Sequence, residues 1–497
     1  MSARGSVVVI GSGLGGLAVA VRLAASGLSV LVLEKGATPG GRAAPVVREG
    51  FSFDAGPTVV TAPFLFDELF ELAGRRREER VQFLPVRPFY RLFDVRGSRL
   101  DCSPNLDALL EQIRLLNPAD REGFLALRDA SRAIFQRAWP LAQRPFLTLG
   151  DMVRILPDLW RMKAYRTVYS YVSRLLRDDF LRRCFSFHPL FLGGNPLEVP
   201  AIYALIHELE RTWGVWYPRG GMGALVHALV QLLEELGGRL QCGREVVEIL
   251  VERGRAVGVR LRDGSTVRAD AVVADVDPAH LYLHLLPPDR RSWLNTLRFR
   301  HLARYSMSLF IVYFATDRTY AESELAHHNI VFGPRYQGLL RDIFRARRLP
   351  EDFSLYVHMP TRTDPSVAPP GCATFYVLAP VPNLAAPVDW EHVAPRYREG
   401  LLRFLEERFL PDLRRHLLFV HHVDPRHFAR AYNTHLGTGF TLQPVFTQSA
   451  WFRPHNRSGA LRGLYLVGAG THPGPGLPGV LLSARITQAL VEEELSR

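Results

Sequence analysis

A glycine-rich turn between two apolar runs constrains the fold of this chain more than any other feature. Residues 7–10 predict a buried parallel strand, residues 14–26 a helix, and residues 29–33 a second buried strand. The turn before the helix has G-x-G-x-x-G spacing and contains Gly11, Gly13, Gly15 and Gly16. A strand, such a turn, a helix and a second strand are typical of a dinucleotide-binding βαβ unit.

The positions of this unit have separate expected roles. Gly11 permits the tight turn, Gly13 leaves room for a pyrophosphate, and Gly16 lets the helix pack close to the sheet. The helix N-terminus directs unpaired N–H groups at the phosphates. Glu34 ends the second strand, where a carboxylate can accept hydrogen bonds from ribose hydroxyls. We therefore predict a dinucleotide site, with a purely structural βαβ unit as the alternative.

The segment after Glu34 extends this site. Residues 35–42 form a turn that begins with Lys35 and ends in Gly40, Gly41 and Arg42. In such an ending, the exposed backbone of the glycines and the guanidinium of the arginine can both contact a phosphate group. The run from Gly11 to Gly56 resembles the extended signature of flavoproteins of the glutathione-reductase and amine-oxidase type. That resemblance implies that the dinucleotide is FAD.

A second strong signal lies near the C-terminus. Residues 463–468 predict a strand and turn, and a glycine–proline loop then leads into a helix predicted over residues 481–495. So many glycines imply that backbone approaches something flat and bulky. A helix N-terminus at this point could stabilise the negative charge of a reduced flavin. We expect Gly470, Gly479 and Val480 to border the cofactor.

Composition limits where the protein acts. The chain has 497 residues, 47% of them apolar, and a formal net charge of +12. No run approaches the ~18 apolar residues of a membrane span, and the first apolar stretch is the βαβ strand, so we expect no signal peptide and no transmembrane helix. No nucleic-acid motif accompanies the positive charge. The remaining interpretations are a solvated surface or contact with anionic lipid, on the cytoplasmic side.

Cysteines and histidines give no metal signature. The four cysteines are widely spaced without a C-x-x-C pair, which predicts neither zinc nor a disulfide framework. The adjacent pairs His327-His328 and His421-His422 cannot share a helix face, so we expect them in loops or at sheet edges and not as ligands.

The elements along the chain predict interleaved domains. The fold class is α/β, with a Rossmann-type FAD-binding domain of the glutathione-reductase/amine-oxidase kind over residues 1–80, 214–290 and 455–497. A mixed-sheet substrate domain is expected from residues 81–105 and 291–454, and a helical, membrane-facing cap from residues 106–213.

Motifs along nearly the whole chain resemble one family. They include GSGLGGL and GGR near the start, FSFHPLFLGGNP and ERTWGVWYPRGGMGALV in the middle, AHHNIVFGPRY and EDFSLYVHMP further on, and LYLVGAGTHPGPGLPGV at the end. The chain closely resembles bacterial-type phytoene desaturases of the FAD-dependent carotenoid and retinoid oxidoreductase family. It departs from many amine-oxidase relatives at Ala469 and Gly470, where those place a carboxylate for the flavin's ribityl chain.

This resemblance implies the activity. Such enzymes desaturate phytoene, an apolar C40 polyene, to neurosporene or lycopene by hydride transfer to flavin N5 and proton loss, with quinone or oxygen as acceptor. It also implies that the backbone near Val246 faces adenine. The alternatives are a later-acting carotenoid desaturase, such as a 3,4-desaturase, and a prenyl-binding escort protein that has lost flavin chemistry. The intact glycines, Glu34 and Arg42 disfavour the escort.

Two further hypotheses concern catalysis and substrate delivery. Asp178 and Arg182 would share a helix face at i and i+4, either at the substrate tunnel, handling charge, or as a surface salt bridge. Because phytoene is insoluble in water, we expect docking on a lipid surface through residues 106–200. The expected contacts are Trp139, Phe146, Trp160 and Tyr165 with the headgroup boundary, and Arg154, Arg161, Lys163 and Arg166 with lipid phosphates.

Overall fold

The dinucleotide-binding half of the molecule is built on a parallel sheet. The computed structural model describes residues 5–496, and in it the strand order of this five-stranded sheet is β19-β13-β1-β2-β9. All four strand pairs are parallel. The predicted βαβ unit is confirmed as β1, α1 and β2. The bounds are β1 Ser6–Ile10, α1 Leu14–Ala25, β2 Ser29–Leu33, β9 Arg239–Gln241, β13 Ala271–Ala274 and β19 Leu464–Leu466.

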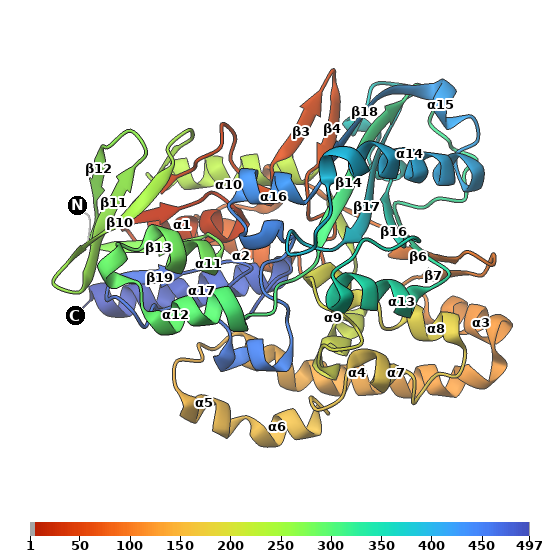
Figure 1. Cartoon of the computed structure of the whole chain (residues 1–497), viewed down its shortest axis with the longest axis horizontal. Helices are drawn as coiled ribbons and strands as arrows, with labels where there is room; N and C mark the ends of the chain where they lie inside the picture. The colour runs from red at the N-terminus through yellow and green to blue at the C-terminus, as the bar shows by residue number, and fades with distance from the viewer. Residues whose placement is uncertain (1–4, 497) are drawn as a thin grey trace.

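Helices from three distant parts of the chain cover this sheet. The helix α1 packs against α17 (Leu477–Leu495) and α10 (Met222–Glu235), and α2 (Phe64–Glu71) contacts both α1 and α17. Their apolar side chains share one buried cluster with β1 and β2. A three-stranded antiparallel sheet lies at the edge of this half of the molecule, on the left in Figure 1. It is formed by β10 Val246–Glu252, β11 Arg255–Leu261 and β12 Thr266–Arg268. The helix α17 begins four residues before the predicted start, because Pro478 is tolerated in a first helical turn.

The second half contains a mixed seven-stranded sheet. Its order is β18-β14-β17-β16-β15-β6-β7, and the pair β15–β6 is parallel whereas the other pairs are antiparallel. The helix α14 (Trp390–Arg408) packs on one face through an apolar cluster. The strands are β6 Tyr90–Asp94, β7 Arg99–Cys102, β14 Ser308–Thr316, β15 His328–Phe332, β16 Leu355–His358, β17 Ala373–Val381 and β18 Leu417–Val423.

The two histidine pairs lie in different parts of this sheet. His421 and His422 are on the edge strand β18, as predicted. The other pair is divided: His327 lies in the loop directly before β15 (His328–Phe332), as predicted, whereas the prediction is wrong for His328. His328 begins β15, which lies between β16 and β6, and both side chains are buried, at 3% and 0% exposure. Burial is possible because these imidazoles find hydrogen-bond partners inside the protein.

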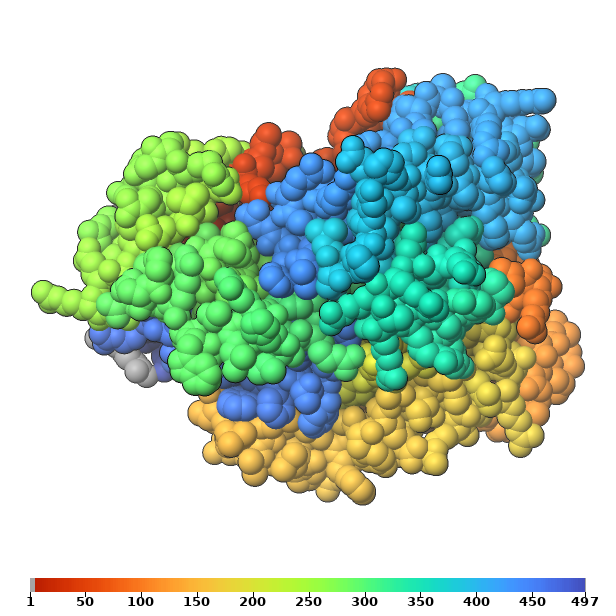
Figure 2. Space-filling model, viewed as in Figure 1, coloured from red at the N-terminus to blue at the C-terminus, as the bar shows by residue number. Residues whose placement is uncertain are grey.

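Helices α4 to α7 form the lower side of the molecule in Figure 1, and the same part of the chain forms the lower surface in Figure 2. Several start at a capping side chain, such as Asn105 before α3, and Thr148 forms a capping box with Asp151 at α5. The domain boundaries given above stay predictions. The helices are α3 Leu106–Leu116, α4 Arg121–Ala142, α5 Leu149–Arg154, α6 Leu156–Arg161, α7 Val168–Val172, α8 Asp179–Cys184 and α9 Leu205–Trp213.

Buried polar contacts join segments that are distant in sequence. Asp54, at the end of β4 (Phe51–Asp54), accepts hydrogen bonds from the Met222 N–H at 2.7 Å and the Tyr217 hydroxyl at 3.0 Å. Removal from water raises the pKa of Asp54 to about 6. These bonds fix the start of α10 against β4. None of the helices formed by residues 5–496 combines the length and apolar character that a membrane crossing needs.

Candidate active site

One cavity connects the parallel sheet with the helical cap. Its volume is about 610 Å³. At one end it is lined by the glycine turn after β1 and by the segment after β13. At the other end it is lined by apolar side chains of α5 and α6 and of the seven-stranded sheet. Ligands of open parallel sheets bind at the carboxyl ends of the strands, and this cavity opens at that position.

The glycine turn is packed too tightly for side chains. A Cβ at Gly16 would lie 2.1 Å from the Gly11 carbonyl oxygen, so Gly16 is required for the helix to start this close to the turn. A Cβ at Gly13 would lie 2.6 Å from Asp275 Oδ2. Gly11 has a φ of +94°, which disfavours other residues. The turn therefore presents bare backbone to the cavity.

Asp275 is a central part of this turn that sequence reasoning missed. Its Oδ2 accepts the Gly16 N–H at 2.8 Å, and a Cβ at Gly15 would come within 3.0 Å of its Oδ1. Asp277 follows and accepts the Ala279 N–H at 2.8 Å. Removal from water raises the pKa of Asp275 to about 7 and that of Asp277 to about 6. The available signal was their position directly after the apolar run of residues 271–274, which forms β13.

Arg42 provides a buried positive charge at this end. Desolvation by burial lowers its pKa, while Asp277 and Asp275 oppose that effect through their charges. Its Nε is buried without a hydrogen-bond partner among residues 5–496. A guanidinium left with an unused donor at a cavity wall, beside a helix N-terminus, suits an anionic diphosphate.

Glu34 and Lys35 hold the rim next to the turn. Glu34 Oε2 accepts the Ser12 N–H at 2.9 Å and the Ser12 hydroxyl at 2.7 Å, and its Oε1 accepts the Gly36 N–H at 2.7 Å. The Lys35 ammonium donates to the Arg430 carbonyl and to Asn433 Oδ1. Both side chains also line the cavity.

Almost all of the residues predicted to bind the cofactor come together here. The exception is Gly16, which lies behind the turn and serves helix packing, as its expected role requires. The predicted residues that line the cavity are Gly11, Gly13, Gly15, Glu34, Lys35, Gly41, Arg42, Val246, Gly470, Gly479 and Val480.

The other end of the cavity is apolar, with one buried acid. Glu210 is 5% exposed and accepts the Tyr90 hydroxyl at 2.7 Å. His188 Nε2 lies 3.3 Å from the second carboxyl oxygen. All three side chains line the cavity. Trp139 and Phe146, which we expected on the outer surface, line it too: Phe146 is 4% exposed, and Trp139 packs against Phe135 and Trp213.

Asp178 and Arg182 lie away from this cavity. Within residues 5–496 neither belongs to its lining. Asp178 caps α8 by accepting the Leu181 N–H at 2.8 Å, and Arg182 donates to the Leu176 carbonyl. The i,i+4 ion pair of this helix joins Asp179 and Arg183 instead. The geometry therefore gives the catalytic hypothesis for Asp178 and Arg182 no support.

The parallel sheet, the bare glycine turn and the joined apolar chamber define a dinucleotide-binding protein with a large apolar ligand site. The model of the flavin-containing amine oxidoreductase family matches residues 14–487. The chain belongs to this family, and within it to the bacterial-type phytoene desaturases. It is an FAD-dependent oxidoreductase, and the residues described above fit FAD.

Individual relatives support this placement. The chain is 48% identical to a lycopene-forming phytoene desaturase of Pseudescherichia vulneris, over 98% of this chain and 99% of the relative. It is 42% identical to a neurosporene-forming phytoene desaturase of Cereibacter sphaeroides, over 98% and 94% of the two chains. The fold matches cyclohexylamine oxidase from Brevibacterium oxydans with a TM-score of 0.61 at 17% identity, over 99% of this chain and 100% of the oxidase chain.

Proposed function

We propose that this protein desaturates phytoene to neurosporene or lycopene. The observation that carries the proposal is the single cavity that joins the dinucleotide site to an apolar chamber. A hydrocarbon chain binds where apolar side chains surround it and water is excluded. The chamber has such walls, formed in part by Met152 of α5, Leu159 of α6 and Ile155 between the two helices. Relatives over almost the full length bear this activity in their names.

The protein's contribution to this reaction is orientation and charge. Bound FAD supplies the two-electron acceptor for hydride. Gly13, Gly15 and Arg42 would hold its diphosphate, and Glu34 its ribose. As hydride leaves the polyene, positive charge develops on the carbon chain. The carboxyl group of Glu210 lies on the chamber wall, where removal of water strengthens its interaction with that charge.

We further propose that the substrate enters from a bilayer through α5 and α6. The inward side chains Met152, Ile155 and Leu159 are buried at the cavity. The outward side chains are also apolar, although they are exposed: Leu149 58%, Val153 56%, Leu156 51% and Trp160 71%, with Tyr165 nearby at 57%. A helix pair that is apolar on both sides suits a position between a lipid surface and an apolar chamber.

Cations surround this apolar outer face. Arg154 is 82% exposed and Arg161 61% exposed at the ends of α5 and α6. The guanidinium of Arg166 lies over the Tyr165 ring, 5.4 Å from its centroid. Arginines beside inserted aromatic rings can contact lipid phosphates while the rings occupy the headgroup boundary.

The test is incubation of the FAD-loaded protein with phytoene in liposomes, followed by chromatography of the extracted pigments. Parallel samples under nitrogen receive a quinone or none, and a third receives oxygen, which identifies the electron acceptor. Neurosporene or lycopene is the expected product. Turnover only with a more conjugated carotenoid would instead identify a later-acting desaturase. A protein that binds polyisoprenoid without bound flavin or turnover would identify the escort alternative.

A further inference from the structure

Three buried histidines lie close together beside the cavity. They are His327 just before β15, His328 at the start of β15 and His358 at the end of β16, with exposures of 3%, 0% and 0%. One ring nitrogen from each lies within 4.8 Å of one from each of the others. Burying three imidazoles is costly unless their nitrogens are used, so their arrangement calls for a function.

Hydrogen bonds connect these rings to the cavity. Thr58 and Tyr356 both line the cavity, and their hydroxyl oxygens are 2.6 Å apart. The Tyr356 hydroxyl is in turn 2.8 Å from His328 Nδ1. A polar path therefore leads from the chamber wall into the interior of the sheet.

Hydrogen bonds also connect the rings to the outside. His358 Nε2 lies 2.9 Å from His327 Nε2, and His327 Nδ1 lies 2.7 Å from the Thr363 hydroxyl. Thr363 is partly exposed, just beyond the end of β16. The second half of the path thus runs from His358 to the surface.

The two halves meet at stacked rings. The centroids of His328 and His358 are 5.3 Å apart with an interplanar angle of 21°. Among residues 5–496, His328 Nε2 and His358 Nδ1 are the nitrogens of this trio that lack a hydrogen-bond partner. If His328 Nδ1 accepts from Tyr356, the ring proton of His328 is on Nε2, which is then a donor. If His327 Nδ1 donates to Thr363, His327 Nε2 accepts from His358 Nε2, and His358 Nδ1 is then an acceptor. One water bonded to both would complete the chain.

We propose that Tyr356, His328, His358 and His327 carry the proton released by each desaturation from the chamber to the surface at Thr363. This proposal rests on the proposed function, because only a reaction that releases protons in a dry chamber needs such a path. Within this proton path Tyr356 is the catalytic residue, because it lines the chamber and contacts the substrate. The three histidines act through Tyr356.

The step balances in atoms and electrons. One C–H bond breaks with loss of hydride, for which FAD is the oxidant. The electron pair of the neighbouring C–H bond forms the new double bond. Its proton passes to the Tyr356 oxygen while Tyr356 gives its own proton to His328 Nδ1. Each histidine, and the water that bridges His328 and His358, accepts a proton on one side and releases one on the other, and Thr363 passes the last to solvent.

The protonation states suit this transfer. Burial lowers the pKa of His328 and His358 well below the usual value, and lowers that of His327 to about 3. Burial also raises the pKa of Tyr356. Neutral imidazoles and a neutral phenol each have one donor and one acceptor, which is the condition for passing a proton along without trapping it.

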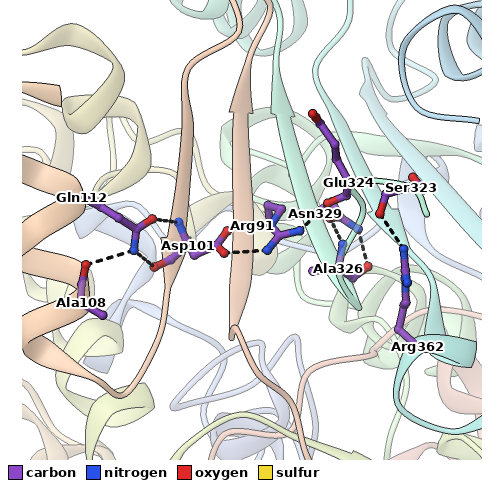
Figure 3. A network of polar contacts seen from close by, with 9 residues as sticks. All are labelled: Arg91, Asp101, Ala108, Gln112, Ser323, Glu324, Ala326, Asn329 and Arg362. Carbon is purple, nitrogen blue, oxygen red and sulfur yellow. Dashed lines mark hydrogen bonds and ion pairs between the residues drawn. The ribbon is translucent and has the colours of Figure 1, made fainter. Parts of the chain in front are cut away.

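The side chains of Asn329 and Arg362 brace the segments that carry the path (Figure 3). The Asn329 amide donates to the Ala326 carbonyl at 2.8 Å and accepts the Ala326 N–H at 2.7 Å, which fixes the short turn that carries His327 and His328. Arg362 donates to the Ser323 carbonyl at 2.7 Å and holds the segment next to Thr363. Neither bracing side chain is itself part of the path.

Substitutions that keep the approximate size of each side chain but remove its ability to transfer a proton test the proposed path. Tyr356→Phe, His328→Asn and His358→Gln should each lower product formation from phytoene in liposomes by about 10²-fold, with FAD content and melting temperature retained. Because the residues act in series, Tyr356→Phe/His358→Gln should lose no more than either single variant. The control His421→Asn, on the edge strand of the same sheet, should keep full activity. Single variants with normal rates, or losses that multiply in the double variant, would overturn the relay.

A second measurement does not depend on turnover. Nitrogen-15 NMR of histidine-labelled protein, assigned with the variants, reports the tautomer of each ring. We expect the proton of His328 on Nε2 and that of His327 on Nδ1. The opposite tautomer at His328 refutes the relay even if phytoene proves not to be the substrate. Absence of desaturation by the wild-type protein, with the expected tautomers in place, would count against the proposed function instead.

Discussion

The two ends of the cavity are built in different ways. The cofactor end is made of backbone from turns after adjacent parallel strands, and its charged groups Arg42, Asp275 and Asp277 lie within it. The substrate end is made of side chains from the cap, the second sheet and the loops between them, with Glu210 as its buried acid. A site made of backbone tolerates almost no added side-chain volume, whereas in a site made of side chains a substitution can change size or charge in small steps.

The largest expected effect is at the backbone end. Gly13→Val should abolish FAD binding, because even the first added carbon would lie 2.6 Å from Asp275 Oδ2 and would occupy the face that the diphosphate approaches. The measurement is the flavin content of the purified protein. Gly400→Val is the control, since Gly400 lies in α14 with open space around it. Normal flavin content in the Gly13 variant would refute the assigned site.

At the substrate end, Glu210→Gln should lower the rate of desaturation by about 10²-fold while FAD binding is kept. The amide keeps the shape and can still accept the Tyr90 hydroxyl bond, so the change isolates the carboxyl group. Steady-state product formation and flavin content measured on the same preparation test this. A full rate in the variant would remove Glu210 from the mechanism.

A smaller effect is expected for lipid docking through the outer face of α5 and α6. Leu156→Ser combined with Trp160→Ser should weaken flotation with anionic liposomes by about tenfold, because the headgroup boundary buries these side chains only in part and a loss of about 1.4 kcal/mol corresponds to a factor of ten. High salt should reduce binding further without removing it, since only the arginine contribution is screened.

The matched control for this surface is Leu418→Ser. Leu418 is 50% exposed, as Leu156 is at 51%, but it lies on β18 at the opposite side of the molecule in Figure 1. Equal effects of Leu156→Ser and Leu418→Ser would show that α5 and α6 are not the docking surface. A protein that floats with neither anionic nor neutral liposomes would refute docking altogether.

The smallest expected effect concerns the acid inside the glycine turn. Burial raises the pKa of Asp275 from its ordinary value of 3.8 to about 7 in the folded protein. The folded state therefore binds more protons between about pH 4 and 7, and the free energy of unfolding falls as pH rises through that window. Asp275→Asn should raise the melting temperature of the FAD-free protein at pH 8 by about 2–4 °C and change it little at pH 4. An equal shift at both values would contradict this origin.

Prediction from sequence succeeded where a short motif fixes the backbone. The βαβ unit, the role of Gly16 and the cavity positions of Glu34, Arg42 and Val246 followed from spacing alone or from the family signature. It failed where contacts join distant segments. Asp275 lies more than 250 residues from the turn that it fills, and Trp139 and Phe146 face the chamber although their apolar character fits an outer surface equally well.

The sequence by itself determined the Rossmann unit, FAD as the cofactor and the family, because glycine spacing and strand–helix periodicity act over short distances along the chain. Only the tertiary structure decided which side chains surround the substrate end, that Asp178 caps a helix away from the cavity, and that His327, His328 and His358 meet beside it. The physical reason is that neighbouring strands set these positions. The pairing of β15 with β16 brings together histidines that are thirty residues apart, and no local pattern encodes that register.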